Sequence, residues 1–140
     1  MIKILLADDE PNILLLTEML FKEMGMTVIT AVNGQEVIDK AKSEKPDIIV
    51  TDIVMPEKSG FDVCKELRAT SDFDNIPIIL LSALGDDLNK ITGFDEGADD
   101  YITKPFNLEE LKARVNAALF RYKARERLLG PTLMLRFWVR

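Results

Sequence analysis

Short apolar runs alternate with amphipathic segments along nearly the whole chain. The runs are rich in Ile, Leu and Val, which is typical of strands buried on both faces of a sheet. The segments between them carry apolar residues at spacings of three and four, which is typical of helices that bury one side. The predicted strands are residues 2–7, 27–31, 47–51, 76–82 and 100–103, and the predicted helices are residues 11–25, 33–45, 60–70, 86–97 and a long one from about 108.

This alternation predicts an α/β fold. Parallel neighbouring strands need a crossover connection, and a helix between each pair of strands supplies one. Right-handed crossovers then build a doubly wound sandwich with helices on both faces of the sheet. The functional crevice of such a fold lies outside the carboxyl ends of the strands. Polar residues at those ends are therefore the first candidates for function.

Four of the five predicted strands end in groups that carry chemistry. They are Asp8, Asp9 and Glu10 after the first strand, Asp52 after the third, Ser82 after the fourth and Lys104 after the fifth. In a sheet of order 2-1-3-4-5 these four strands are consecutive neighbours, so their ends would meet in one pocket. Taken singly, each residue also has a structural explanation, such as a helix start, a turn or a solvated position.

Taken together, these groups suit phosphoryl transfer. Crowded carboxylates need a cation, and an oxygen-only cluster favours Mg²⁺ or Mn²⁺ over zinc. Asp52 is a candidate nucleophile that would form an aspartyl phosphate, and Ser82 is placed to hydrogen-bond the product. Lys104 is a candidate partner for the phosphoryl oxygens. Asp8, Asp9 and Glu10 are the candidate metal ligands after the first strand, and Asp9 or Glu10 could instead favour the positive end of the following helix.

Composition narrows the function further. The 140 residues are 47% hydrophobic and 30% charged, which is ordinary for one globular domain, and the net charge of −6 argues against direct nucleic-acid binding. The absence of His excludes a Cys–His catalytic pair and the usual zinc sites. The single cysteine, Cys64, is predicted to be a core residue on a helix. No apolar run approaches the length needed to span a membrane, and we expect a cytoplasmic protein.

Four stretches carry a family resemblance, namely ILLADDEPN, PDIIVTDIVMPEKSG, PIILLSA and GADDYITKPF. In their order and spacing, over about residues 2–122, the sequence resembles the receiver domain of two-component response regulators. The resemblance implies a flavodoxin-like receiver fold with a five-stranded parallel sheet of order 2-1-3-4-5. It implies a receiver domain over residues 1–122 and leaves residues 123–140 as a helix extension and an apolar tail.

The resemblance also implies roles for the acidic residues. Asp52 would accept a phosphoryl group from a sensor histidine kinase or a phosphotransfer protein. Asp9 would bind Mg²⁺ directly and Asp8 through water, with Asp52 and the backbone carbonyl of Val54 as further ligands. The chain would not be an enzyme in the usual sense, because its chemistry would be limited to self-phosphorylation and autodephosphorylation.

The remaining implied roles belong to the switch. Lys104 would contact the phosphoryl group, and Ser82 would be the switch hydroxyl, with Tyr101 turning inward when that hydroxyl engages the phosphoryl group. The Lys104–Pro105 peptide bond would be cis. The readout would pass through the face formed by the fourth helix, the fifth strand and the fifth helix.

That face is also a candidate surface for a homodimer. Its charges would pair across a two-fold axis, although ordinary solvated charge explains them equally well. The charged residues are Lys90, Asp99, Asp100, Arg114 and Arg121.

Two other function classes fit the sequence less well. A metal-dependent phosphohydrolase of the haloacid-dehalogenase type needs a second Asp two residues after the nucleophile, where this chain has Val54. A flavodoxin-like cofactor binder needs a phosphate loop rich in Ser, Thr and Gly after the first strand, and none follows it. Residues 132–140 are apolar and β-prone, and an output domain, a partner-binding tail and an engineered sequence are all open explanations for them.

Overall fold

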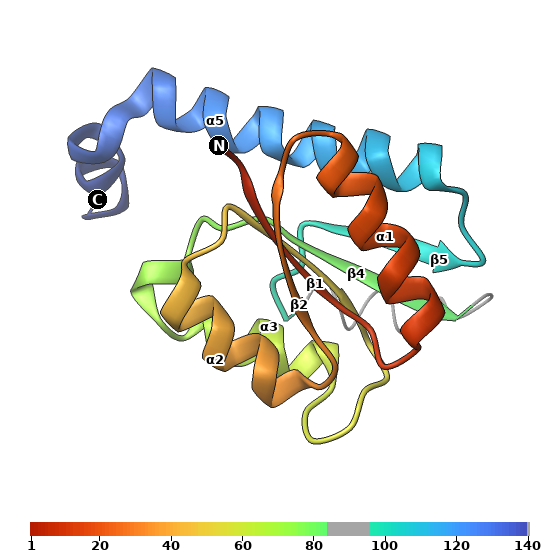
Figure 1. Ribbon diagram of the computed structural model, residues 1–140. Coiled ribbons are helices and arrows are strands. Elements are labelled where there is room, and N and C mark those ends of the chain that lie inside the picture. The colour runs from red at the N-terminus through yellow and green to blue at the C-terminus, as the bar shows by residue number, and fades with distance from the viewer. Residues whose placement is uncertain (84–95, 140) are drawn as a thin grey trace.

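The computed structural model describes residues 1–83 and 96–139, and the side chains as far as residue 124. Its strands are β1 (Lys3–Ala7), β2 (Thr27–Ala31), β3 (Ile48–Asp52), β4 (Ile78–Ala83) and β5 (Asp100–Lys104), as Figure 1 shows. Its helices are α1 (Pro11–Glu23), α2 (Gly34–Glu44), α3 (Gly60–Arg68), the short 3₁₀ helix η1 (Ser71–Phe73) and α5 (Leu108–Val139). These elements confirm the predicted alternation, whereas most of the helix predicted over 86–97 lies outside the described residues.

The five strands form one parallel sheet of order β2-β1-β3-β4-β5, which confirms the predicted fold class and strand order. The register pairs Ala7 with Thr51 and Asp52 with Leu81. It also pairs Ala83 with Lys104. Since all strands point the same way, the carboxyl ends of β1, β3, β4 and β5 lie along one edge of the sheet.

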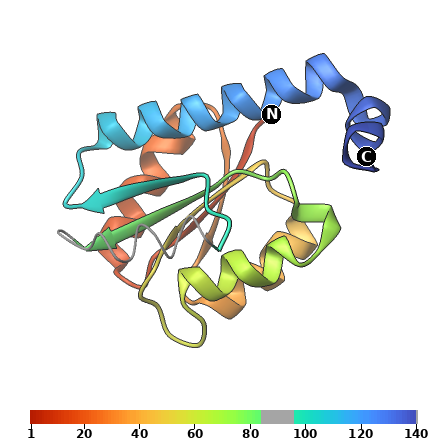
Figure 2. The same cartoon turned by 180° about the vertical axis from the view of Figure 1, so that it is seen from behind.

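Helices cover both faces of the sheet, with α2 and α3 on one side and α1 and α5 on the other (Figures 1 and 2). Side chains alternate along each strand, so Leu5 and Ile49 pack towards α2 and α3, and Ile4 and Val50 pack towards α1 and α5. Burial of each such side chain contributes about 1.5–3 kcal/mol relative to exposure. These two cores hold the strand ends in place.

Two helices that flank the site begin at side-chain caps. The carboxamide oxygen of Asn33 accepts a hydrogen bond from the amide of Glu36 at the start of α2. Ser59 and Asp62 form a reciprocal capping box at the start of α3. Such caps satisfy amide groups that the first helical turn leaves without partners, so they define where each helix starts.

Helix α5 starts at Leu108 as predicted, but it continues through Gly130 and Pro131 to Val139. The expectation of a β-prone segment after Pro131 is therefore wrong for the described backbone. A β-prone composition leads to a strand only where a neighbouring strand pairs with it, and no such pairing forms along this described segment. The last part of α5 projects past the sheet in Figures 1 and 2. Among the described residues, no helix has an apolar stretch that would cross a membrane.

Candidate functional site

Three carboxylates meet at the carboxyl edge of the sheet. One carboxylate oxygen from each of Asp8, Asp9 and Asp52 lies within 4.8 Å of the others. Asp8 and Asp52 are buried, and Asp9 is exposed at the rim. Buried carboxylates so close together repel one another unless a cation or a proton compensates them.

Backbone amides hold one oxygen of each buried carboxylate. Oδ1 of Asp8 accepts a hydrogen bond from the amide of Glu10 at 2.9 Å. Oδ1 of Asp52 accepts one from the amide of Ile53 at 2.8 Å. These contacts orient both side chains, so that the second oxygen of each carboxylate points to the same neighbour.

That neighbour is Lys104, at the end of β5. Its Nζ lies 2.9 Å from Oδ2 of Asp8 and 3.0 Å from Oδ2 of Asp52. Burial acts to lower the pKa of Lys104, but the hydrogen bonds and charges of the two carboxylates outweigh it, so this pKa lies above its ordinary value. The ammonium group therefore stays charged and bridges residues that are far apart in the sequence.

For Asp52, burial is the dominant influence on the pKa. Burial raises the pKa of Asp52, and the hydrogen bond and charge of Lys104 offset only part of that rise, to which the charge of Asp8 adds. The pKa of Asp52 thus lies above its ordinary value because one lysine does not compensate the removal of the carboxylate from water.

The charge balance of the site suits a divalent cation. Asp8, Asp9 and Asp52 bring three negative charges, and Lys104 brings one positive charge. Hard cations such as Mg²⁺ prefer carboxylate and carbonyl oxygens. The residues present therefore fit Mg²⁺. Val54, the predicted carbonyl ligand, lies in the loop directly after β3 with its side chain exposed.

The predicted switch residues lie beside the acidic cluster. Ser82, on β4, is buried, and its hydroxyl donates a long hydrogen bond of 3.5 Å to the carbonyl of Ala83. Tyr101, on β5, is only 6% exposed and packs in the core below α2 and α3. The Lys104–Pro105 peptide bond is cis.

Glu10 lies at the start of α1, as predicted. This residue is the N-cap of α1, but its side chain makes no capping hydrogen bond. Its backbone contributes instead, because its amide donates to Asp8 and its carbonyl accepts from Leu14. The amide of Glu10 thus orients a carboxylate of the acidic cluster.

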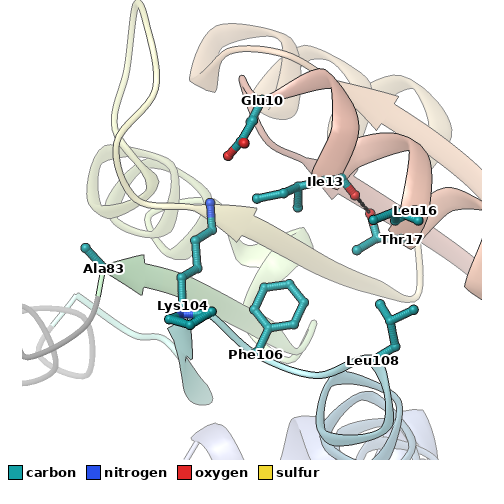
Figure 3. A pocket seen from close by; sticks show the side chains of 9 residues that line it. Glu10, Ile13, Leu16, Thr17, Ala83, Lys104, Phe106 and Leu108 are labelled. Atoms are coloured by element: carbon teal, nitrogen blue, oxygen red, sulfur yellow. Dashed lines mark hydrogen bonds between the residues drawn. The ribbon is translucent and has the colours of Figure 1, made fainter.

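A cavity of about 490 Å³ opens next to Lys104, between α1 and the loop that joins β5 to α5. In Figure 3, Glu10 and the ammonium group of Lys104 lie at one end of this cavity, and Phe106 and Leu108 lie at the other. Its walls are mostly apolar, and the lining residues are Glu10, Ile13, Leu16, Thr17, Ala83, Lys104, Pro105, Phe106 and Leu108. Sequence reasoning missed this cavity, although α1 carries more apolar residues than one buried face needs, and its Leu15, Leu16 and Met19 are exposed.

Three charges of the predicted dimer face, Asp99, Asp100 and Arg114, already have partners within the chain. Asp100 forms an ion pair of 2.8 Å with Arg114, and Asp99 forms one of 2.8 Å with Arg68. Oδ2 of Asp99 also accepts a hydrogen bond from the amide of Ile78. Arg121 is exposed, and Lys90 lies outside the described residues. A dimer through this face would therefore have to share or exchange existing ion pairs.

Cys64, on α3, is fully buried, as predicted for a core residue. Burial raises the pKa of its thiol to about 12, and only the thiolate is nucleophilic. We therefore expect a thiol reagent at pH 8 to leave the folded protein unlabelled and to label the urea-unfolded chain once. Intact mass after a fixed reaction time measures this, and rapid labelling of the folded protein would contradict the burial of Cys64.

A parallel sheet of order 2-1-3-4-5, with three carboxylates and a lysine at its carboxyl edge, defines a flavodoxin-like domain with an acidic pocket. The family description "response regulator receiver domain" matches residues 4–116, so the chain belongs to that family. Receiver domains are signalling modules of two-component systems and interact with histidine kinases. As part of this class, the chain is not an enzyme of a classical kind.

Individual relatives agree with this family. The chain is 44% identical over 119 residues to the alkaline phosphatase synthesis transcriptional regulatory protein PhoP of Bacillus subtilis. These residues are 85% of this chain and 49% of PhoP. It thus spans about half the length of the curated relatives it matches. The receiver domain of Francisella response regulator 1452 superposes with a TM-score of 0.80 and 39% identity, covering 86% of this chain and 98% of that one. Chemotaxis response regulator CheY4 of Vibrio cholerae superposes with a TM-score of 0.80 and 31% identity. This match covers 84% of this chain and 98% of that one.

Proposed function

We propose that this domain accepts a phosphoryl group on Asp52, in a Mg²⁺-dependent transfer from a phosphohistidine of a sensor histidine kinase or a phosphotransfer protein. The observation that carries this proposal is the bridge from Lys104 to both Asp8 and Asp52 inside a cluster of three carboxylates. A structural ion pair needs one carboxylate for one lysine. An excess of buried acid beside a lysine is instead suited to binding a cation and a phosphoryl group together.

In the proposed step, an oxygen of the Asp52 carboxylate attacks phosphorus. The new O–P bond forms while the P–N bond of the phosphohistidine breaks, and its electron pair stays on the imidazole nitrogen. The Ile53 amide holds Oδ1 of Asp52, so Oδ2, which faces Lys104, is the oxygen available to the phosphoryl group. Bound Mg²⁺ would supply charge neutralisation at the phosphoryl oxygens, with Asp8, Asp9, Asp52 and the Val54 carbonyl as its ligands.

Lys104 then has a second role in the same step. Its ammonium group contacts Oδ2 of Asp52 before transfer and would contact a phosphoryl oxygen attached there afterwards. Such positioning is most of what phosphoryl transfer requires of a protein, because little covalent chemistry remains for it to do. Slow self-dephosphorylation would follow when water replaces Asp52 on phosphorus.

Ser82 and Tyr101 are proposed to read the phosphorylated state. Asp52 is in register with Leu81, which places Ser82 one residue further along the neighbouring strand. The hydrogen bond that its hydroxyl donates to Ala83 is long, at 3.5 Å, so a phosphoryl oxygen would be a better acceptor. A shift of Ser82 would be transmitted through β4 to β5 and the buried ring of Tyr101, and so to the output face and a dimer built on it.

The apolar cavity next to Lys104 supports the approach of a protein phosphodonor from the side of α1. Leu15, Leu16 and Met19 on α1 are each more than half exposed, and Leu16 also lines the cavity. Apolar side chains that are exposed beside a reactive group favour a protein partner that covers them during transfer.

Incubation with a small-molecule phosphodonor and Mg²⁺ tests the proposed function. We expect intact mass to show the gain of one phosphoryl group, and no gain when EDTA replaces Mg²⁺. The matched control is the same protein unfolded in urea, which retains every side chain but not the pocket. Absence of any gain in the folded protein, or equal gain in the unfolded one, would refute the proposal.

A further inference from the structure

The loop of residues 53–59, which we call the β3–α3 loop, links Asp52 to α3 and carries Val54. Its two ends are joined, because the amide of Gly60 donates a hydrogen bond of 2.8 Å to the carbonyl of Ile53. Ile53 and Met55 point into the core while Val54 is exposed. The position of this loop therefore decides where the backbone just after Asp52 lies.

The N-terminus of α2 presses against this loop from one side. The amide of Gly34 donates a hydrogen bond of 3.3 Å to the carbonyl of Pro56. A Cβ atom on Gly34 would lie 2.0 Å from the carbonyl oxygen of Lys58 and 2.6 Å from its carbonyl carbon. Both are backbone atoms, so any side chain at position 34 would push the loop or the helix away.

Helix α3 holds the loop from the other side. A Cβ atom on Gly60 would lie 2.6 Å from the carbonyl oxygen of Asp52, so α3 also approaches the backbone closely. Nζ of Lys58 pairs with Glu66 of α3 at 2.6 Å. The loop is thus held between two helix starts, and a push from α2 on Lys58 acts on the short segment that joins Asp52 to α3.

We infer that Gly34 is a positioning residue for phosphoryl transfer. Because Gly34 has no side chain, the start of α2 can pack closely against the β3–α3 loop. This packing holds the loop in the position that keeps the Asp52 carboxylate and the Val54 carbonyl together at the acidic cluster. The chemistry of this role rests on the proposed function. Its geometry rests on the hydrogen bond from Gly34 to Pro56 and on the lack of space for a Cβ atom beside Lys58. Gly34 is not a member of the acidic cluster and would act on it only through the position of the loop.

The substitution Gly34→Ala tests this role. Displacement of groups that support metal ligands weakens metal binding by about 10–100-fold, and we expect a loss of Mg²⁺ affinity in that range. If Gly34 mattered only to α2, Ala would be neutral or stabilising there, since Ala is the better helix former. Mg²⁺ titration followed by the amide resonances of residues 53–55, 57 and 58 measures both the affinity and the position of the loop.

Ala41→Gly is the matched control. It weakens α2 at a buried position seven residues along the same helix, away from the β3–α3 loop. We expect its Mg²⁺ affinity to stay near that of the wild type although its melting temperature falls. Equal losses of affinity in the two variants, or a Gly34→Ala variant that binds Mg²⁺ like the wild type, would overturn the inference.

Lys58→Gly keeps the inference testable if Gly34→Ala does not fold. It removes the ion pair to Glu66 and frees the loop backbone, so it is expected to weaken Mg²⁺ binding in the same way. Unchanged affinity in this variant would count against the inference. The two proposals fail separately: a wild type that binds Mg²⁺ but gains no phosphoryl group refutes the proposed function, while the affinities of the variants still decide the role of Gly34.

Discussion

Asp52→Asn is expected to abolish phosphoryl incorporation from a small-molecule phosphodonor in the presence of Mg²⁺. The amide keeps the size of the side chain and an oxygen that accepts hydrogen bonds from Ile53 or Lys104, but it has no nucleophilic carboxylate oxygen. The loss should therefore reflect chemistry and not a change of fold. Intact mass after a fixed incubation measures the incorporated group.

Asp39→Asn is the matched control for this experiment. Asp39 is an exposed carboxylate on α2 that accepts a hydrogen bond from Gln35, and its replacement should leave incorporation unchanged. The fold of Asp52→Asn is checked by its melting temperature without Mg²⁺. Because the pKa of Asp52 is raised in the folded state, its ionised form opposes folding at pH values above that pKa, so Asn should not lower the melting temperature. Labelling that survives Asp52→Asn would place the phosphoryl group elsewhere.

Asp9→Ala is expected to remove Mg²⁺-dependent phosphorylation at Mg²⁺ concentrations that saturate the wild type. Without Asp9, the two remaining carboxylates share Lys104. The net negative charge of the cluster, which favours a divalent ion, then falls by half. Asp9 is exposed and is not needed for the core, so the variant should fold. We expect the Mg²⁺ affinity to fall by about 100-fold, at the upper end of the range for losses around a metal.

Glu10→Ala provides the comparison for Asp9→Ala. Glu10 is the next acid along the chain and is also exposed, but its carboxylate is not among the three that cluster and makes no cap to α1. Its replacement changes net charge by the same amount and should leave Mg²⁺ affinity nearly unchanged. Calorimetric titration of both variants with Mg²⁺ measures the difference, and equal affinities would remove Asp9 from the proposed ligand set.

The acidic cluster and its lysine were predictable because each residue follows an apolar run directly. Ile4, Ile49 and Ile79 lie in runs that only a two-sided parallel strand would bury, and the fold rule then places Asp8, Asp52 and their neighbours at one edge. The β-prone tail was misjudged for the opposite reason. Its composition favours a strand, but backbone pairing with a neighbour decides that outcome, and composition carries no information about pairing.

The amino-acid pattern alone determined the alternation of strands and helices, the identity of the acids and Lys104, and the buried place of Cys64. Such features depend on local backbone preference and on burial, which a sequence records directly. Only the tertiary structure decided that Lys104 bridges Asp8 and Asp52, that Glu10 contributes its amide and not its carboxylate, and that Gly34 touches the backbone of Lys58. These contacts join residues far apart in the chain, and their distances follow from how helices and strands pack rather than from any local run of residues.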